Sequence, residues 1–294
     1  MYRAEMLKLR TTRATWVVAA VAVAGMLVVQ AFTLLLPTIL RGTEMLGGGG
    51  LQAPPGAVAE LAPELDSLVD VTQPAFQRSM LDLLGAGPGG SSSVGVATIC
   101  MLLLGVLAVT TDFRTGGIVP TALVQPSRLR VLAAKAGATA TVALGVGVVL
   151  ALLGAAGLLL AIITTPGAGL ALGPVDVLGV WGRGLAVLVL LSWFGLGIGT
   201  LVRGQVAAVV TVGALALAEP IARGAVTLLS GGTSAAAEWL PLGLGALASA
   251  GPSGAALLGG AAPLGVFAAL LGLVAWVAVV LGGGAVSLQR RDLV

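Results

Sequence analysis

Few residues in this sequence could do chemistry, and they are charged residues placed between long apolar runs. The 294 residues include 15 Lys and Arg and 12 Asp and Glu, and histidine is absent. Imidazole catalysis and zinc binding by histidine are therefore excluded. Cys100 is the one cysteine, which excludes a disulfide framework. A phosphate-binding loop requires Gly-Lys-Ser or Gly-Lys-Thr, and neither lysine, Lys8 or Lys135, follows a glycine.

The densest group of charges lies in the segment 112–135, between the second and third apolar runs. It holds four of the fifteen basic residues, and it is much longer than the roughly 2–8 residues that usually join two helices. Its middle is a short stretch of mixed apolar and polar residues, as a helix lying on the membrane surface would be. This pattern predicts a docking surface for a partner; the alternative is a long connector whose charges only set topology. The candidate docking residues are Asp112, Arg114, Gly116, Gly117, Pro126, Arg128, Arg130 and Lys135.

A second group, Glu5, Lys8 and Arg10, lies in the N-terminal segment 1–13. Apolar residues recur on one helical face of this segment, and arginines lie on a neighbouring face. We expect an amphipathic interface helix that lies among lipid headgroups. The alternative is a segment that acts only as a topology signal.

A third group interrupts the fifth apolar run. Glu219 and Arg223 are spaced i, i+4, so they can pair on one helix face. Glu219 lies about 24 Å along a helix from Arg203 at 1.5 Å per residue, near the outer boundary of the membrane. Pro220 predicts a break in the helix. We expect the pair to close the outer mouth or the helix break; a substrate or gating role is the alternative.

Composition indicates that lipid surrounds most of this chain. Apolar residues make up 57% of it and charged residues 9%, against roughly 25% charged in a soluble domain. Such a chain is not disordered. Charge-free windows of about 20 residues predict transmembrane helices. The windows predict six spans, at 15–36, 94–111, 138–163, 181–202, 205–218 and 263–286.

The alternatives to this all-α membrane fold are weak. The runs are apolar on every side, whereas strands of a membrane barrel alternate. The first run could be read as a signal peptide, but it is too long, and its small-residue cleavage patterns fall too early. After the break at 219–220 we expect an outer segment to about 252, of the kind that can re-enter the membrane. Small residues recur in spans three and four, but a chain with 45 glycines produces such spacings by chance, so they predict no dimer face.

Orientation follows from the basic residues. With six spans both termini lie on one side, which carries eleven Lys and Arg against four on the other. The positive-inside rule places the termini, including the tail 287–294, in the cytoplasm. Residues 37–93 then form a large extracellular loop, in which Leu61, Leu65 and Leu68 predict a short amphipathic helix. This loop either captures substrate or acts as a solvated spacer.

These motifs together resemble the permeases of ABC-2 type transporters. The pattern Glu5-x-x-Lys8-x-Arg10-x-x-Arg13 looks like their N-terminus, and 112–135 is similar to their E-x-x-x-G-T…P-x-R-x-x-x-x-x-K region. The ending 290–292, Arg-Arg-Asp, is also similar. The resemblance covers the whole chain in span number, loop lengths and motif order. It departs at Asp112, where Glu is common, and at Gly117, where Thr is usual.

The resemblance implies a single permease domain over 1–294 in the plasma membrane. Such permeases act as two six-span subunits, so the implied partners are a second copy or a homologous permease, a dimer of cytoplasmic ATPase subunits, and lipid, with no nucleic acid. The chain itself would be non-catalytic and hold no cofactor, because ATP and magnesium belong to the ATPase. The 112–135 loop would be the coupling helix, and the cargo a hydrophobic or amphiphilic molecule for export.

Two other functions stay open. A stand-alone secondary transporter would need ionisable groups inside the membrane, and the spans contain almost none. A non-transporting membrane anchor or immunity protein would need no such groups. An intramembrane enzyme is disfavoured, since paired carboxylates and Asp-rich motifs are lacking near the spans.

Overall fold

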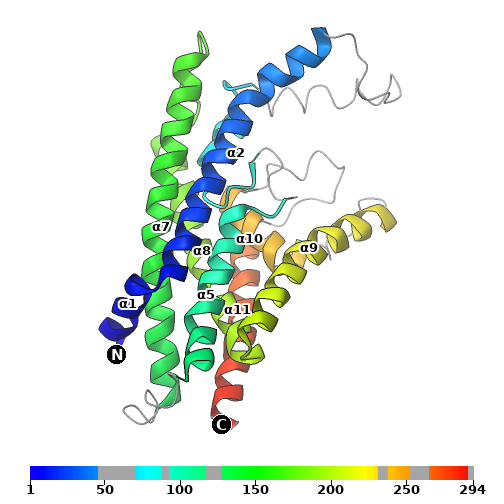
Figure 1. The fold of residues 1–294 in the computed structure, drawn as a ribbon. Coiled ribbons are helices and arrows are strands. Elements are labelled where there is room, and N and C mark those ends of the chain that lie inside the picture. The colour runs from blue at the N-terminus through cyan, green and yellow to red at the C-terminus, as the bar shows by residue number, and fades with distance from the viewer. Residues whose placement is uncertain (46–69, 88–92, 117–126, 231–237, 252–264, 291–294) are drawn as a thin grey trace.

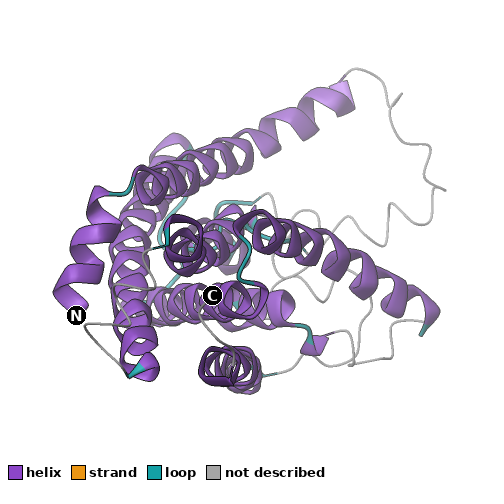
Figure 2. Ribbon diagram, turned by 60° about the horizontal axis from the view of Figure 1, so that its bottom comes forward, coloured by secondary structure: helices purple, strands orange, loops and turns teal. Residues whose placement is uncertain are grey.

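The computed structural model describes residues 1–45, 70–87, 93–116, 127–230, 238–251 and 265–290. These residues form helices, loops and turns, and none of them lies in a strand (Figure 2). Six helices are long and apolar enough to cross a membrane, which confirms the all-helical, multi-pass prediction. They are α2 (Arg13–Met45), α5 (Val96–Thr115), α7 (Arg128–Thr164), α8 (Pro174–Val202), α9 (Gln205–Leu229) and α11 (Val266–Arg290).

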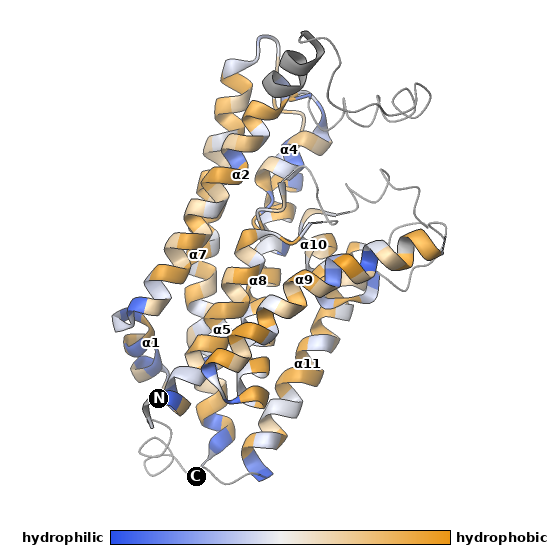
Figure 3. Cartoon of the chain, turned by 45° about the vertical axis from the view of Figure 1, so that its right-hand side comes forward, coloured by the Kyte–Doolittle hydropathy of each residue, from blue (hydrophilic) through white to orange (hydrophobic). Residues whose placement is uncertain are grey.

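Apolar surface extends along these helices, and hydrophilic residues gather on α1 (Tyr2–Thr11) and at the ends of the bundle (Figure 3). The N-terminus and the end of α11 lie at the same end of the bundle (Figure 1). An even number of spans requires this arrangement. We call this end, which also holds the end of α5 and the start of α7, the basic end.

Helix α8 lies at the centre of the bundle and packs against α5, α7, α11 and the short α10 (Pro241–Ala250). Glycines bring α5 and α8 into backbone contact. A Cβ atom at Gly105 would overlap the carbonyl oxygen of Ser192, and one at Gly195 would overlap that of Leu102. Small residues in the membrane thus serve packing within this chain.

The helices extend beyond the predicted spans. Helix α7 begins at Arg128 rather than 138, and α8 begins at Pro174 rather than 181. Pro174 suits a first helical turn, and the Gly173 N–H donates to Asp176 Oδ2 at 3.2 Å, which caps α8. Gaps between charges locate the apolar part of a helix, but polar residues set its ends. As a result residues 112–115 and 128–135 of the predicted loop belong to α5 and α7, and the connection between the two helices runs from 116 to 127.

The predicted break at 219–220 is wrong, because α9 is one helix with Pro220 inside it. Proline removes a single intrahelical hydrogen bond, and in a membrane helix the freed carbonyl can be satisfied by hydroxyl side chains, water or a local adjustment of the helix. The outer end of α9 leans away from the rest of the bundle (Figure 1). The short apolar α10 follows α9, within the segment expected to end near 252, and its residues are buried.

The second half of the predicted extracellular loop is not a solvated spacer. One face of helix α4 (Pro74–Leu81) and the turn after it are buried, with Phe76 and Leu83 wholly inaccessible. Gln77 Nε2 donates to the Gly169 carbonyl at 2.8 Å, and the Ala171 N–H donates to Gln77 Oε1 at 2.9 Å. These bonds fasten α4 to the connection between α7 and α8. The helix predicted from Leu61, Leu65 and Leu68 lies outside the described residues.

Candidate functional site

Four charged side chains from three helices meet at the basic end. Glu5 and Lys8 come from α1, Asp112 from α5 and Lys135 from α7. Lys135 Nζ donates to Glu5 Oε2 at 2.9 Å and to the Ala108 carbonyl at 3.1 Å, and it pairs with Asp112. Lys8 pairs with the other carboxylate oxygen of Asp112. We call Glu5, Lys8, Asp112 and Lys135 the charge cluster.

The charge cluster is buried and balanced. The side chains of Lys135 and Asp112 are 3% and 2% exposed. Two cations face two anions, so each buried charge has a partner, which is the condition under which charges are tolerated in a protein interior. Helical spacing explains the meeting: Glu5 and Lys8 are three residues apart, and Ala108 and Asp112 are four apart, so each pair shares one helix face.

Lys8 forms the outer edge of the charge cluster, with 39% of its side chain exposed. Burial lowers the pKa of Lys8 from its usual 10.5, the charge of Lys135 acts in the same direction, and Glu5 opposes them. The charged form of Lys8 is therefore stabilised by the carboxylates around it.

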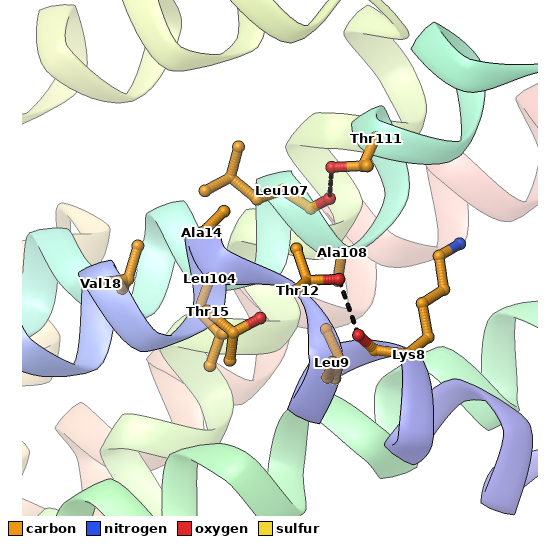
Figure 4. Close-up of a pocket in the computed structure, with 10 residues that line it drawn as sticks. All are labelled: Lys8, Leu9, Thr12, Ala14, Thr15, Val18, Leu104, Leu107, Ala108 and Thr111. Carbon is orange, nitrogen blue, oxygen red and sulfur yellow. Dashed lines mark hydrogen bonds between the residues drawn. The ribbon is translucent and has the colours of Figure 1, made fainter.

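Apolar and polar contacts also hold α1 on the bundle. Leu9 is buried in a cluster that includes Leu132 of α7 and Leu288 of α11, and Tyr2 Oη shares a 2.7 Å hydrogen bond with Thr141 Oγ1. The Thr12 hydroxyl donates to the Lys8 carbonyl at 2.7 Å, which satisfies the end of α1 where the chain turns into α2 (Figure 4). Helix α1 is thus packed against α5 and α7 on one side, rather than lying among headgroups alone.

A small cavity of about 20 Å³ lies where α1, α2 and α5 meet (Figure 4). Leu9, Val18, Leu104 and Leu107 are among its lining residues. Its size is close to that of a single water molecule, so the junction is nearly close-packed. It offers no room for a substrate.

The eight predicted docking residues do not form one surface. Arg114, Gly116 and Arg130 are exposed, whereas Asp112 and Lys135 are buried in the charge cluster. Gly116 ends α5 with φ +69°, a left-handed conformation that favours glycine. Gly117 and Pro126 lie outside the described residues.

Arg128 and Arg10 take other positions. The partly buried Arg128 guanidinium donates to the Leu288 carbonyl and so ties α7 to α11. Arg10 is exposed on α1, and its carbonyl accepts a hydrogen bond of 2.8 Å from Trp16 Nε1. Exposed positive charge therefore flanks the 116–127 connection at Arg114 and Arg130.

Arg203 is a functional candidate that sequence reasoning counted only as a topology charge. It ends α8 with φ 60°, and its guanidinium lies 5.7 Å from the centre of the Phe113 ring. Arg203 Nη2 also donates to the Ser287 carbonyl at 3.1 Å. The residue links α8 with α5 and α11 beside the charge cluster. The sequence signal that could have identified Arg203 is its position directly after an apolar run.

Glu219 and Arg223 do come together, as their spacing predicts, with Arg223 Nε 3.8 Å from Glu219 Oε1. The carboxylate also accepts hydrogen bonds from the backbone N–H groups of Leu242 at 3.0 Å and Gly243 at 2.6 Å. Glu219 thereby caps the N-terminus of α10, where free N–H groups and the helix dipole favour an anion. The pair anchors α10 to α9 rather than closing a helix break.

Asp82 is a second residue that sequence reasoning missed. It follows α4, is 3% exposed, and accepts a 2.7 Å hydrogen bond from Ser249 Oγ of α10. No cation pairs with it within the described parts of the chain. Burial raises the pKa of Asp82 above its usual 3.8, against hydrogen bonds from Ser249 and from the N–H groups of Leu84 and Ala86. The sequence signal that could have identified Asp82 as buried is its position between Leu81 and Leu83.

Among the described residues, no three His, Cys, Asp or Glu side chains are grouped so as to hold a metal ion. The chemistry visible in this part of the chain is ionic pairing and hydrogen bonding. No protein-family model matches the sequence, and no curated protein matches it either.

Proposed function

We propose that this chain is the membrane-spanning permease subunit of an ATP-binding-cassette exporter in the plasma membrane. A dimer of separate cytoplasmic ATPase subunits would bind and hydrolyse ATP with magnesium. A second copy of the chain, or a homologous permease, would complete the pathway. The observation that carries this proposal is the charge cluster, which joins α1, α5 and α7 beside the 116–127 connection.

In such an exporter, movements of the ATPase subunits would have to be transmitted to the transmembrane helices. A subunit moved by a separate ATPase needs a stiff link between its docking surface and its transmembrane helices. Removing one partner of a buried ion pair leaves a charge unpaired in low dielectric, so such a cluster resists being pulled apart. The charge cluster holds α5 and α7 together near the points where the 116–127 connection leaves one helix and enters the other. Arg114 and Arg130 stay exposed there, where they can meet an acidic groove.

The cargo class follows from the composition of the spans. A pathway built from these helices is lined mainly by apolar side chains, which suits a hydrophobic or amphiphilic molecule better than an ion.

The test is to purify this chain from its own cells in mild detergent and to identify, by mass spectrometry, any ATP-binding-cassette ATPase that co-purifies with it. We expect the ATPase to be retained by the unchanged protein and lost on Arg130→Glu. Arg78→Glu makes the same charge change at an exposed position on α4, at the opposite end of the bundle, and should retain the ATPase. Equal retention by both variants would contradict docking at the α5–α7 connection. Arg128 is unsuitable for this test because its reversal also breaks the contact with Leu288.

Asp82 favours a second candidate, a stand-alone secondary transporter coupled to protons. A buried carboxyl group among membrane helices is the kind of group that binds and releases a proton during transport. The test is flux in liposomes that contain this chain alone, under a pH gradient. Flux that is lost in Asp82→Asn would support this candidate, and no flux without a partner would reject it.

A further inference from the structure

An apolar groove runs between α7 and the first two helices. Its volume is about 490 Å³, within the range of roughly 300–1,000 Å³ that is usual for ligand sites. Ala20 and Val23 of α2 form one wall, and Val146 and Val149 of α7 form the other. Gly145 of α7 also lines it, and a Cβ atom added there would meet no atom within 4 Å. The groove is therefore open at Gly145.

One end of the groove is cationic. Arg10 lines it at the basic end, together with Trp16. The indole N–H of Trp16 donates to the Arg10 carbonyl at 2.8 Å, which holds the end of α1 over the groove. Tryptophan and arginine are the residues that membrane proteins place at the level of the headgroups.

The groove is held open by the contacts of α1. The Tyr2–Thr141 hydrogen bond and the packing of buried Leu9, which itself lines the groove, fasten α1 to α7, so the walls of the groove cannot simply close. An apolar trough that ends at an interfacial guanidinium matches an acyl chain joined to an anionic headgroup, and the anionic groups at the membrane surface are mainly lipid phosphates.

We propose that this groove binds one phospholipid with an anionic headgroup. An acyl chain lies along the apolar walls past Gly145, and the phosphate pairs with the Arg10 guanidinium. Charge complementarity selects this occupant over a neutral lipid, because each basic residue near the membrane surface attracts anionic lipid. The site tethers α1, and with it Glu5 and Lys8 of the charge cluster, to the inner leaflet.

The experiment uses the whole protein reconstituted with phosphatidylglycerol or phosphatidylcholine of identical acyl chains, followed by native mass spectrometry of retained lipid. Gly145→Leu fills the groove. Gly213→Leu is its matched control, since a Cβ at Gly213 of α9 also meets no atom within 4 Å. Arg10→Gln removes the cation, and Arg3→Gln removes one from an exposed position of α1 that does not line the groove.

We expect Gly145→Leu to abolish retained phosphatidylglycerol, while Gly213→Leu retains it. Arg10→Gln should lower the preference for phosphatidylglycerol over phosphatidylcholine about fivefold, the effect of one basic residue at the surface, and Arg3→Gln should preserve the preference. Equal thermal unfolding of the two glycine variants verifies that both are folded.

The proposal is overturned if Gly145→Leu retains as much phosphatidylglycerol as Gly213→Leu, or if Arg10→Gln and Arg3→Gln behave alike. It is also overturned if Gly145→Leu changes the oligomeric mass and leaves lipid retention unchanged, because the groove would then seat a second copy. ATPase retention is measured separately at Arg130, so failure here leaves the proposed function intact.

Discussion

Lys135 lies where two carboxylates and one main-chain carbonyl converge, and no other cation can fill its place in the charge cluster. We expect Lys135→Met to lower the free energy of unfolding by about 3–5 kcal/mol, because Asp112 would stay buried with Lys8 as its one remaining partner. Denaturant unfolding in detergent measures the change.

The half-exposed Lys8 provides the control for this prediction. Solvent can reach the Asp112 edge when Lys8 is removed, so Lys8→Met should cost less stability than Lys135→Met. The double variant Lys135→Met with Asp112→Asn should cost less than the sum of its single changes. Additive losses would show that the residues do not act as one cluster.

Asp82 makes stability depend on pH. Its folded-state pKa is raised above 3.8 by burial, so its contribution to stability is fully present below pH 3.8 and is lost as pH rises through the folded-state pKa. Asp82→Asn removes this titration and preserves an acceptor for Ser249 Oγ. We therefore expect the unfolding temperature of the unchanged protein to fall with rising pH relative to the variant. Parallel pH profiles would contradict a buried, titrating Asp82.

Helix α10 depends on a side chain from another helix. Glu219→Ala leaves the buried N–H groups of Leu242 and Gly243 without their acceptor, which should cost about 1–3 kcal/mol of stability. Amide exchange at these two positions should accelerate in the same variant. Glu219→Gln keeps an acceptor oxygen and should lose less. Unchanged exchange in Glu219→Ala would mean that α10 is held by packing alone.

The crossing of α5 and α8 depends on the absence of a side chain. Gly195→Ala forces a methyl group against the Leu102 carbonyl, and such overpacking should destabilise the protein by about 1–3 kcal/mol. Gly213→Ala places the same methyl in open space and should be neutral or slightly stabilising, since alanine favours helix. Thermal unfolding of both variants in one detergent makes the comparison. Equal unfolding temperatures would show that the two helices can separate at little cost.

The whole molecule has one basic end, and its orientation can be measured directly. Cys100 is buried, so it adds little background to thiol labelling. We expect a membrane-impermeant maleimide to label Gln73→Cys, just before α4, in intact cells. The same reagent should label Gln289→Cys, at the end of α11, only after the cells are permeabilised. The reverse labelling pattern would show that the basic end faces outward, which would contradict the proposal that a cytoplasmic ATPase docks there.

Much of the architecture follows from local rules. Six charge-poor runs become six helices because backbone groups in lipid must be satisfied within each segment. The i, i+4 spacing of Glu219 and Arg223 likewise predicts their pairing. Helix ends were predicted less well because polar residues beyond the apolar runs set them. The continuity of α9 through Pro220 was missed because one proline does not have to end a membrane helix.

The sequence by itself determined that this chain is a helical membrane protein, how many spans it has and which connections carry its charge. Only the tertiary structure decided that Glu5 reaches Lys135 across 130 positions, and that Asp82 turns inward to Ser249 rather than outward to water. The physical reason is that hydropathy is a property of each residue, whereas the partner of a buried charge depends on how distant helices pack. The charge cluster, the capped α10 and the groove at Arg10 all depend on this packing of distant helices.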